Sequence, residues 1–375
     1  MGAPGMTGAT TETTPGGAAA VRRLGAPQWM HGPIADVALA LVWIPFAVVA
    51  HVLQGQAGDR LPAFVAAVFL LSFSHQPLTL ALVYGDPEQL RLRRAIFTWS
   101  PLVFVVAVFA GLNISMVALA VVGGLWNAEH TLMQRYGIVR IYGRKAGQGD
   151  GRLERAMLFS WLALALVWVG ADTATPDRIR QVDLGENNTL AVEQLASLRG
   201  VASVLVPIAL AVALGLGVAF VVQEWRHRRQ ANPAKWVYVA STAALFGVLL
   251  VDPLAGLMGY VGAHAVEYFV VVRQSLGRRY GTEPVGAEAP AAGGAPVRRP
   301  VPLARAVRSP LGRDGFLAVY VAVIVGIVMV LERLGSPTAY AVVFFTLGGL
   351  HVFYDGFIWK LRRAPVAASL AIPTS

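Results

Sequence analysis

The sequence predicts an all-α protein, a polytopic transmembrane helix bundle of about ten spans with both termini in the cytoplasm. Three observations predict this fold: the composition, the length of the apolar segments and the position of the basic residues. The chain has 375 residues, of which 56% are hydrophobic and only 14% are charged, whereas soluble domains are about a quarter charged. Several segments approach or exceed the roughly 20 apolar residues that a helix needs to cross a bilayer.

The basic residues predict the orientation of the bundle. If the N-terminus is cytoplasmic, only five of the 31 Lys and Arg residues fall on the outside, namely Arg60, Arg178, Arg180, Arg199 and Arg333. Such an excess on one side is typical of the cytoplasmic loops of membrane proteins. The net charge of +10 therefore reflects topology and contact with anionic lipid headgroups. We expect a multi-pass protein of the cell inner (plasma) membrane, with membrane lipid as a partner and no nucleic acid.

Each apolar segment is bounded by polar or turn-forming residues, and each is predicted to form one transmembrane helix. The predicted spans are 35–53, 62–84, 95–111, 114–138, 155–171, 200–223, 236–251, 255–273, 316–333 and 337–358. Composition divides the chain further. We expect a disordered tail (1–33), an eight-span core (34–279), a flexible cytoplasmic linker rich in Ala, Gly and Pro (280–312), a C-terminal hairpin that completes the site (313–363) and a tail (364–375). Residues 172–198 form the one sizeable outside loop, with room for a short interfacial helix.

Four histidines lie inside these apolar spans: His75, His130, His264 and His351. Ionisable groups inside membrane helices are costly, so they usually face the bundle interior and mark a functional site. The last three lie nine or ten residues before the basic end of their spans, at the same depth. His75 is nominally deeper, but Pro77 can kink its helix. We therefore predict a shared site. The small residues before two of the histidines, Gly262, Ala263, Gly348 and Gly349, would let helices approach closely.

Three of the histidines are followed by another polar residue at a spacing that places both on one face of a helix. Residues three or four positions after a histidine share its helix face, and such pairs supply two ligands or one ligand and its orienting partner. The candidate metal ligands are His75, His130, His264, His351, Glu267 and Asp355. The candidate catalytic residues are Glu267, Asp355 and Tyr268, and the candidate cofactor-binding residues are Gln134 and Tyr354.

The absence of cysteine excludes disulfides, thiolate metal sites and iron–sulfur clusters. The remaining ligand set of imidazole and carboxylate suits iron, zinc, manganese or copper(II). The expected cofactor is non-haem iron, as one or two ions, with another divalent metal as the alternative.

The segments SHQPLTLALVYGDPEQ, EHTLMQRYGIVRIYGRK, HAVEYFVVVR and HVFYDGFIWKLRR resemble a largely uncharacterised group of bacterial polytopic membrane proteins with one histidine motif per span. The last segment resembles an H-x-x-x-D-x-x-I-W-K/R pattern. More distantly, the arrangement is similar in logic to membrane non-haem iron desaturases, hydroxylases and carotene-cleaving dioxygenases. The chain lacks the HxxxH and HxxHH boxes of the desaturases, so the resemblance does not extend to their ligand scheme.

The leading functional hypothesis is a membrane non-haem metal oxidoreductase of the desaturase, hydroxylase or oxygenase kind. It would act on a hydrophobic small-molecule substrate dissolved in lipid and take electrons from a separate donor protein, because the chain shows no flavin or dinucleotide motif. The alternative is a haem-binding protein or one that translocates metal ions or protons. A third hypothesis is a membrane transferase that uses one histidine as a general base.

Overall fold

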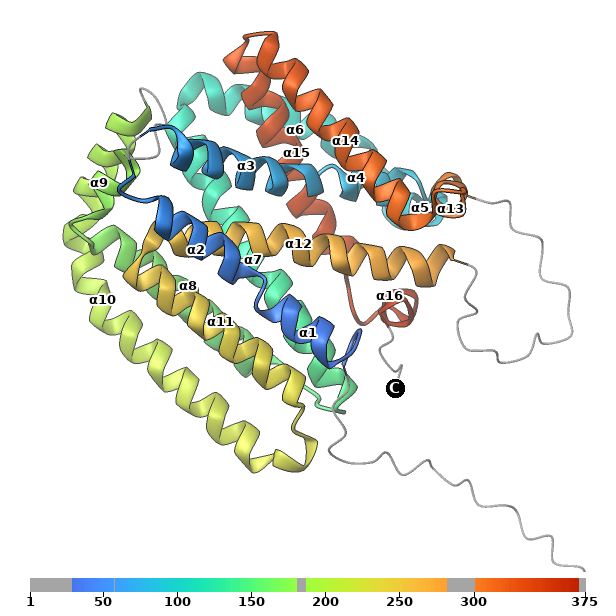
Figure 1. Ribbon diagram of the computed structural model, residues 1–375, viewed down its shortest axis with the longest axis horizontal. Coiled ribbons are helices and arrows are strands. Elements are labelled where there is room, and N and C mark those ends of the chain that lie inside the picture. Colours follow the sequence, from blue (N-terminus) through green and yellow to red (C-terminus); the bar gives the residue numbers. More distant parts are fainter. Residues whose placement is uncertain (1–28, 57, 181–186, 282–300, 371–375) are drawn as a thin grey trace, which may run out of the picture.

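The computed structural model describes residues 29–56, 58–180, 187–281 and 301–370, and these form helices joined by turns, without a strand. Nine helices among them are long and apolar enough to cross a membrane. The protein is therefore an all-α polytopic bundle (Figure 1). The predicted tails and much of the predicted linker (1–28, 282–300 and 371–375) lie outside the described residues.

The helices follow the predicted spans closely. In chain order they are α1 (Pro33–Ala40), α2 (Trp43–Leu53), α3 (Arg60–His75), α4 (Leu78–Tyr84), α5 (Pro87–Leu92), α6 (Arg94–Ile114), α7 (Met116–Lys145), α8 (Arg152–Ala171), α9 (Thr175–Arg180), α10 (Asn187–Arg226), α11 (Pro233–Val251), α12 (Pro253–Tyr280), α13 (Pro302–Val307), α14 (Gly312–Arg333), α15 (Pro337–Ile358) and α16 (Ala364–Ser369). The predicted outside loop thus contains α9 and the first turns of α10.

The helix α7 corresponds to the predicted span 114–138 but is not among the nine apolar helices. It is 30 residues long, more than enough to cross a bilayer. Its middle part carries Asn127, Glu129, His130 and Arg135, which reduce its mean hydropathy. Its polar residues are among those that build the candidate site.

Proline interrupts the span that carries His75. The helix α3 ends at His75 and α4 begins at Leu78, because Pro77 has no N–H to continue the helical hydrogen bonds. The amide of Gln76 instead donates to the carbonyl of Phe73 at 3.1 Å. The break lies at the depth of the other histidines.

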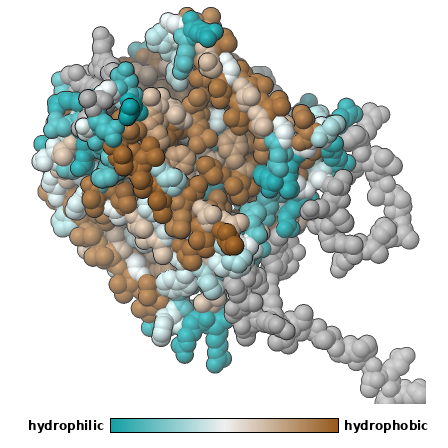
Figure 2. All heavy atoms as spheres, viewed as in Figure 1, coloured by the Kyte–Doolittle hydropathy of each residue, from teal (hydrophilic) through white to brown (hydrophobic). Residues whose placement is uncertain are grey.

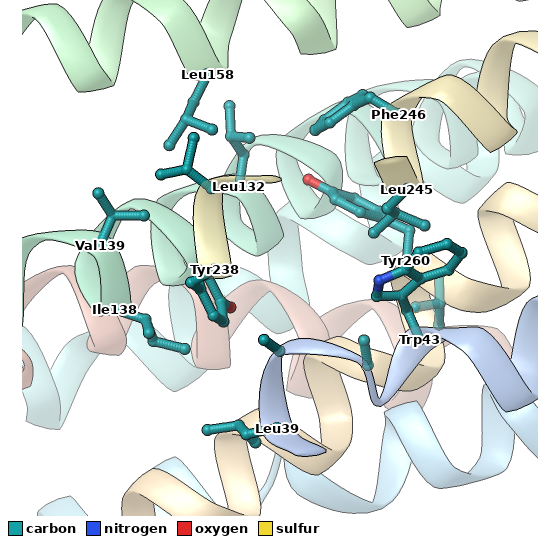
Figure 3. Packing of buried hydrophobic residues seen from close by; sticks show 14 of the residues in the cluster. Leu39, Trp43, Leu132, Ile138, Val139, Leu158, Tyr238, Leu245, Phe246 and Tyr260 are labelled. Carbon is teal, nitrogen blue, oxygen red and sulfur yellow. The ribbon is translucent and has the colours of Figure 1, made fainter. Parts of the chain in front are cut away.

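The helix α12 lies at the centre of the bundle, in contact with α2, α3, α7, α11, α13, α14 and α16 (Figure 1). Its apolar window is 72% buried, against 11% for α10 and α14. Figure 3 shows part of the core around it, in which Tyr260 packs with Trp43, Leu245 and Phe246. The helices at the periphery of the bundle expose apolar side chains on the surface of the molecule. Figure 2 shows this hydrophobic surface across the middle of the molecule.

Two of the predicted close approaches occur at glycine. A Cβ atom on Gly262 would lie 2.5 Å from the Phe46 ring, and one on Gly349 would lie 2.6 Å from the Phe104 ring. Any larger residue there would push α12 away from α2, or α15 away from α6. Each glycine lies two residues before a buried histidine. The close packing at the glycines therefore fixes the positions of these histidines.

Candidate metal centre

The structure shows a histidine cluster built from four helices. His75 comes from the end of α3, His130 from α7, His264 from α12 and His351 from α15. Their exposed fractions are 0%, 8%, 1% and 0%, so all four are buried. The break at Pro77 brings His75 to the level of the other three. His75 therefore joins the other three histidines, although its position in the sequence is nominally deeper in the membrane.

The imidazole rings approach one another through their Nε2 atoms. The Nε2 atom of His351 lies 3.2 Å from that of His75 and 3.0 Å from that of His130. The ring of His264 lies 4.6 Å from the His75 ring and 5.2 Å from the His130 ring, centroid to centroid. The rings of the three histidines predicted to share one depth lie 4.7–6.3 Å apart, centroid to centroid, as expected for one site.

Two overlapping groups of side chains have their donor atoms within 4.8 Å of one another. One group is His75, His264 and His351, and the other is His130, His351 and Asp355. His351 belongs to both groups. The cluster is therefore continuous and supplies up to five donor groups to one small volume.

The spacing of the ring nitrogens fits metal coordination. With metal–imidazole bonds of about 2.1 Å, two neighbouring ligands of a tetrahedral or octahedral ion lie about 3.0–3.4 Å apart. The two Nε2–Nε2 distances in the cluster fall in that range. A neutral imidazole carries only one N–H, so a group of imidazoles whose nitrogens converge is incompletely satisfied by hydrogen bonds among themselves.

Orphaned ring nitrogens support the same interpretation. Both nitrogens of His264 and the Nδ1 atom of His75 are buried without a hydrogen-bond partner. A buried polar group without a partner costs about 1–3 kcal/mol, and such groups require an explanation. A cation bound among the rings would provide a partner for one nitrogen of His264, because an imidazole binds an ion through one nitrogen at a time.

Thr79 orients two members of the cluster. Its Oγ1 atom donates to Oδ1 of Asp355 at 3.0 Å and lies 2.7 Å from Nδ1 of His351. Because the hydroxyl has only one hydrogen, its oxygen accepts from the Nδ1–H group of His351. That choice leaves the lone pair of the Nε2 atom of His351 directed at the other imidazoles, as in many metal-binding histidines.

Asp355 presents one oxygen to the cluster. Its Oδ1 atom is also 3.2 Å from the hydroxyl of Tyr268. Its Oδ2 atom lies 3.8 Å from Nε2 of His130 and 3.9 Å from Nε2 of His351. The carboxylate is thus held through Oδ1 and turns Oδ2 towards the imidazoles.

Glu267 lies behind the histidines rather than among them. Its oxygens lie 3.1 Å from the guanidinium of Arg135, 2.8 Å from the hydroxyl of Tyr238 and 3.1 Å from the amide nitrogen of Gln134. The same Gln134 nitrogen also lies 3.1 Å from the carbonyl oxygen of His264. Gln134 therefore links the backbone of α12 at His264 to Glu267.

The remaining two predicted site residues differ in their placement. Tyr268 is at the cluster, with its ring 5.0 Å from that of His75 and 5.1 Å from that of His351. Tyr354 is not at the cluster. Its hydroxyl donates to the carbonyl of Phe97 and lies 2.9 Å from Ser100 and 2.8 Å from Tyr84. It joins α15 to α6 and α4.

Sequence reasoning missed three residues of this region. Thr79 follows His75 by four positions, the spacing that was used for the other histidines, so a signal was present. Arg135 is fully buried and paired with Glu267, and an arginine five residues after a membrane histidine was a second signal. Tyr238 had no comparable signal because it lies in an ordinary apolar span.

Comparison with protein-family models, curated proteins and solved structures finds no match for this chain.

Proposed function

We propose that this protein is an integral-membrane oxidoreductase that uses a non-haem metal ion, most suitably iron, to act on a lipid-soluble substrate. One observation carries the proposal. Buried imidazoles from four helices within a membrane bundle form two overlapping groups that share His351, and Asp355 belongs to one of them. Buried ionisable groups are rarely kept in a membrane helix without a function.

The donor set favours a first-row metal that accepts nitrogen and oxygen ligands. Imidazole with carboxylate is the set that suits non-haem Fe(II), and incomplete coordination leaves positions for oxygen and substrate. Because Thr79 occupies Nδ1 of His351, only Nε2 of His351 is free to bind a metal. His351 belongs to both groups of donor atoms, and its single available lone pair can bind only one ion. The two groups therefore favour one ion over two.

The surrounding residues have distinct roles in this proposal. Thr79 holds His351 and Asp355 in place through its hydroxyl. Gln134 fixes the backbone at His264. Tyr268 is the group best placed to hold or donate a proton near the reacting atoms, because its hydroxyl contacts Thr79 and Asp355. The bound ion would supply the redox chemistry, with electrons from a separate donor protein at the inner membrane.

Elemental analysis and an absorption spectrum of the detergent-purified full chain test this proposal. We expect about one equivalent of iron without a Soret band, and its loss in His264→Ala and His351→Ala. His51→Ala is the matched control, because His51 has a side chain that is 73% exposed and pairs with Asp252 away from the cluster. Equal metal content in all four proteins would contradict the proposal.

A proton-translocating role is the second candidate. It is favoured by a continuous set of short contacts from His130 through His351 and Thr79 to Tyr268, with distances of 3.0, 2.7 and 2.7 Å. Such chains of polar groups relay protons in membrane proteins. Haem ligation is disfavoured, because Nε2 atoms 3.0–3.2 Å apart leave no room for a porphyrin between them. Folded protein without metal would support the proton-translocating role.

A further inference from the structure

A groove opens between α12 and α14 on the outside of the bundle. It has a volume of about 640 Å³ and is lined by apolar side chains, with Arg273 as the one charged residue. The lining residues used below are Val266, Phe269, Arg273, Ala318, Ala322 and Val325. Both helices are membrane spans, so the groove faces the interior of the bilayer along most of its length.

The groove exists because α14 packs loosely against the bundle. Ala318 and Ala322 lie four residues apart on one face of α14 and fill little space next to α12. Two contacts hold the helix in place around this gap. The hydroxyl of Tyr320 donates to the carbonyl of Ser74 at 2.9 Å, and Asp314 accepts two hydrogen bonds from Arg273 at 2.6 and 2.8 Å.

The inner wall of the groove adjoins the histidine cluster. Phe269 lines the groove, and its ring centroid lies 6.5 Å from that of His75. Tyr268, the preceding residue, contacts the rings of His75 and His351. One aromatic side chain thus separates the lipid-facing groove from the candidate metal centre.

The charged end of the groove favours an acidic group. Arg273 pairs with Asp314, and Arg313 lies 4.0 Å from the same carboxylate. Two guanidinium groups therefore share one carboxylate, and the local charge is positive. From Arg273 to Val266 the groove follows about two turns of α12, or ~10 Å. This distance is suited to a hydrocarbon chain that runs from an acidic head group into the membrane.

We propose that this groove binds an amphiphile with one hydrocarbon chain and an acidic head group, and that the chain reaches the metal centre past Phe269. The inference rests on the proposed function, since it names the class of substrate for that site. The acidic head group would lie at Arg273 and Arg313. The apolar chain would lie along Ala318, Ala322 and Val325 of α14.

Photolabelling with diazirine-bearing stearic acid tests the groove in the full chain reconstituted in liposomes. We expect adducts on the α12 segment that contains Val266 and Phe269, and at least a fivefold reduction in Ala322→Trp, which fills the groove. The matched control is Val323→Trp on the neighbouring lipid-facing side of α14, where Val323 is 53% exposed. Ala322→Leu provides a milder variant if the tryptophan prevents folding.

The head-group assignment has its own comparison. Arg273→Gln should reduce labelling by the free acid and leave labelling by the matching diazirine methyl ester unchanged. Labelling spread evenly over the lipid-facing helices, with no difference between Ala322→Trp and Val323→Trp, would overturn the proposal. Metal content separates the two levels of inference. Groove labelling in a protein without metal would contradict the proposed function alone, and unaltered metal with no groove labelling would contradict the groove alone.

Discussion

The ion pair between Arg135 and Glu267 allows the sharpest test of the region behind the histidines. Both side chains have an exposed fraction of 0%, and the closest nitrogen and oxygen are 3.1 Å apart. Removing one partner of a buried pair typically costs about 3–5 kcal/mol, because the other charge is left without compensation. The structure predicts that the two single substitutions fall at different ends of this range.

The difference follows from the partners that remain. In Arg135→Met, Glu267 keeps its hydrogen bonds to Tyr238 and Gln134, and it can also become neutral by binding a proton. We expect a loss of about 3 kcal/mol. In Glu267→Leu, Arg135 keeps Thr242 as its only hydrogen-bond partner among the described residues and cannot lose its proton, so we expect about 5 kcal/mol.

Thermal unfolding followed by the fluorescence of the nine tryptophans measures these losses in detergent. At roughly 2 °C per kcal/mol, Arg135→Met should lower the Tm by about 6 °C and Glu267→Leu by about 10 °C. The double variant Arg135→Met with Glu267→Leu removes both charges and should recover most of the loss. A double variant as unstable as the sum of the two single variants would refute the reasoning, and so would the reverse order of the single variants.

The contacts of Thr79, Gly349 and Asp252 allow three further predictions. Thr79→Val removes the hydroxyl that orients His351 and Asp355, so competition of the proposed metal site with a chelator should show a 10- to 100-fold weaker metal affinity. Gly349→Ala forces a methyl group against Phe104 and should cost about 1–3 kcal/mol in thermal unfolding, whereas Gly124→Ala meets no atom within 4 Å and should cost little. Asp252 is partly buried, which opposes its charge, but hydrogen bonds from neighbouring side chains and the backbone outweigh this and lower its pKa. It therefore stabilises the fold above its ordinary pKa of about 4 and loses this effect as the pH falls through the lowered value, so the Tm difference between wild type and Asp252→Asn should vanish in acid.

The fold was predictable because membrane spans are encoded in apolar length. The last predicted span, 337–358, coincides with α15 (Pro337–Ile358). The prediction was less accurate where helices continue into water. The helix α10 begins at Asn187 and α7 continues to Lys145, beyond the predicted 200 and 138. Hydropathy measures the apolar stretch, whereas a helix ends where its backbone hydrogen bonds end, so the two boundaries differ.

The histidine cluster was predictable from matching depths, but its neighbours were only partly so. Spacing along one helix identifies which residues share a face with a histidine, yet the rotation of that helix is set by packing against other helices. Glu267 therefore meets Arg135 of α7 rather than the imidazoles, and Tyr354 meets Ser100 of α6. Contacts between helices that are far apart in sequence, such as Thr79 with His351, leave no periodic signal in either segment.

The distribution of the cluster along the chain has a consequence for biosynthesis. His75, His130 and His264 emerge from the ribosome before α15, which carries both His351 and Asp355. Until α15 inserts, the nascent protein lacks the histidine shared by both groups of donor atoms. If the cluster binds an ion as proposed, we expect the ion to be acquired after α15 has inserted, when the other ligands are already enclosed. Metal loading should then require transient opening of the helix packing, and its rate should depend on the mobility of the peripheral helices.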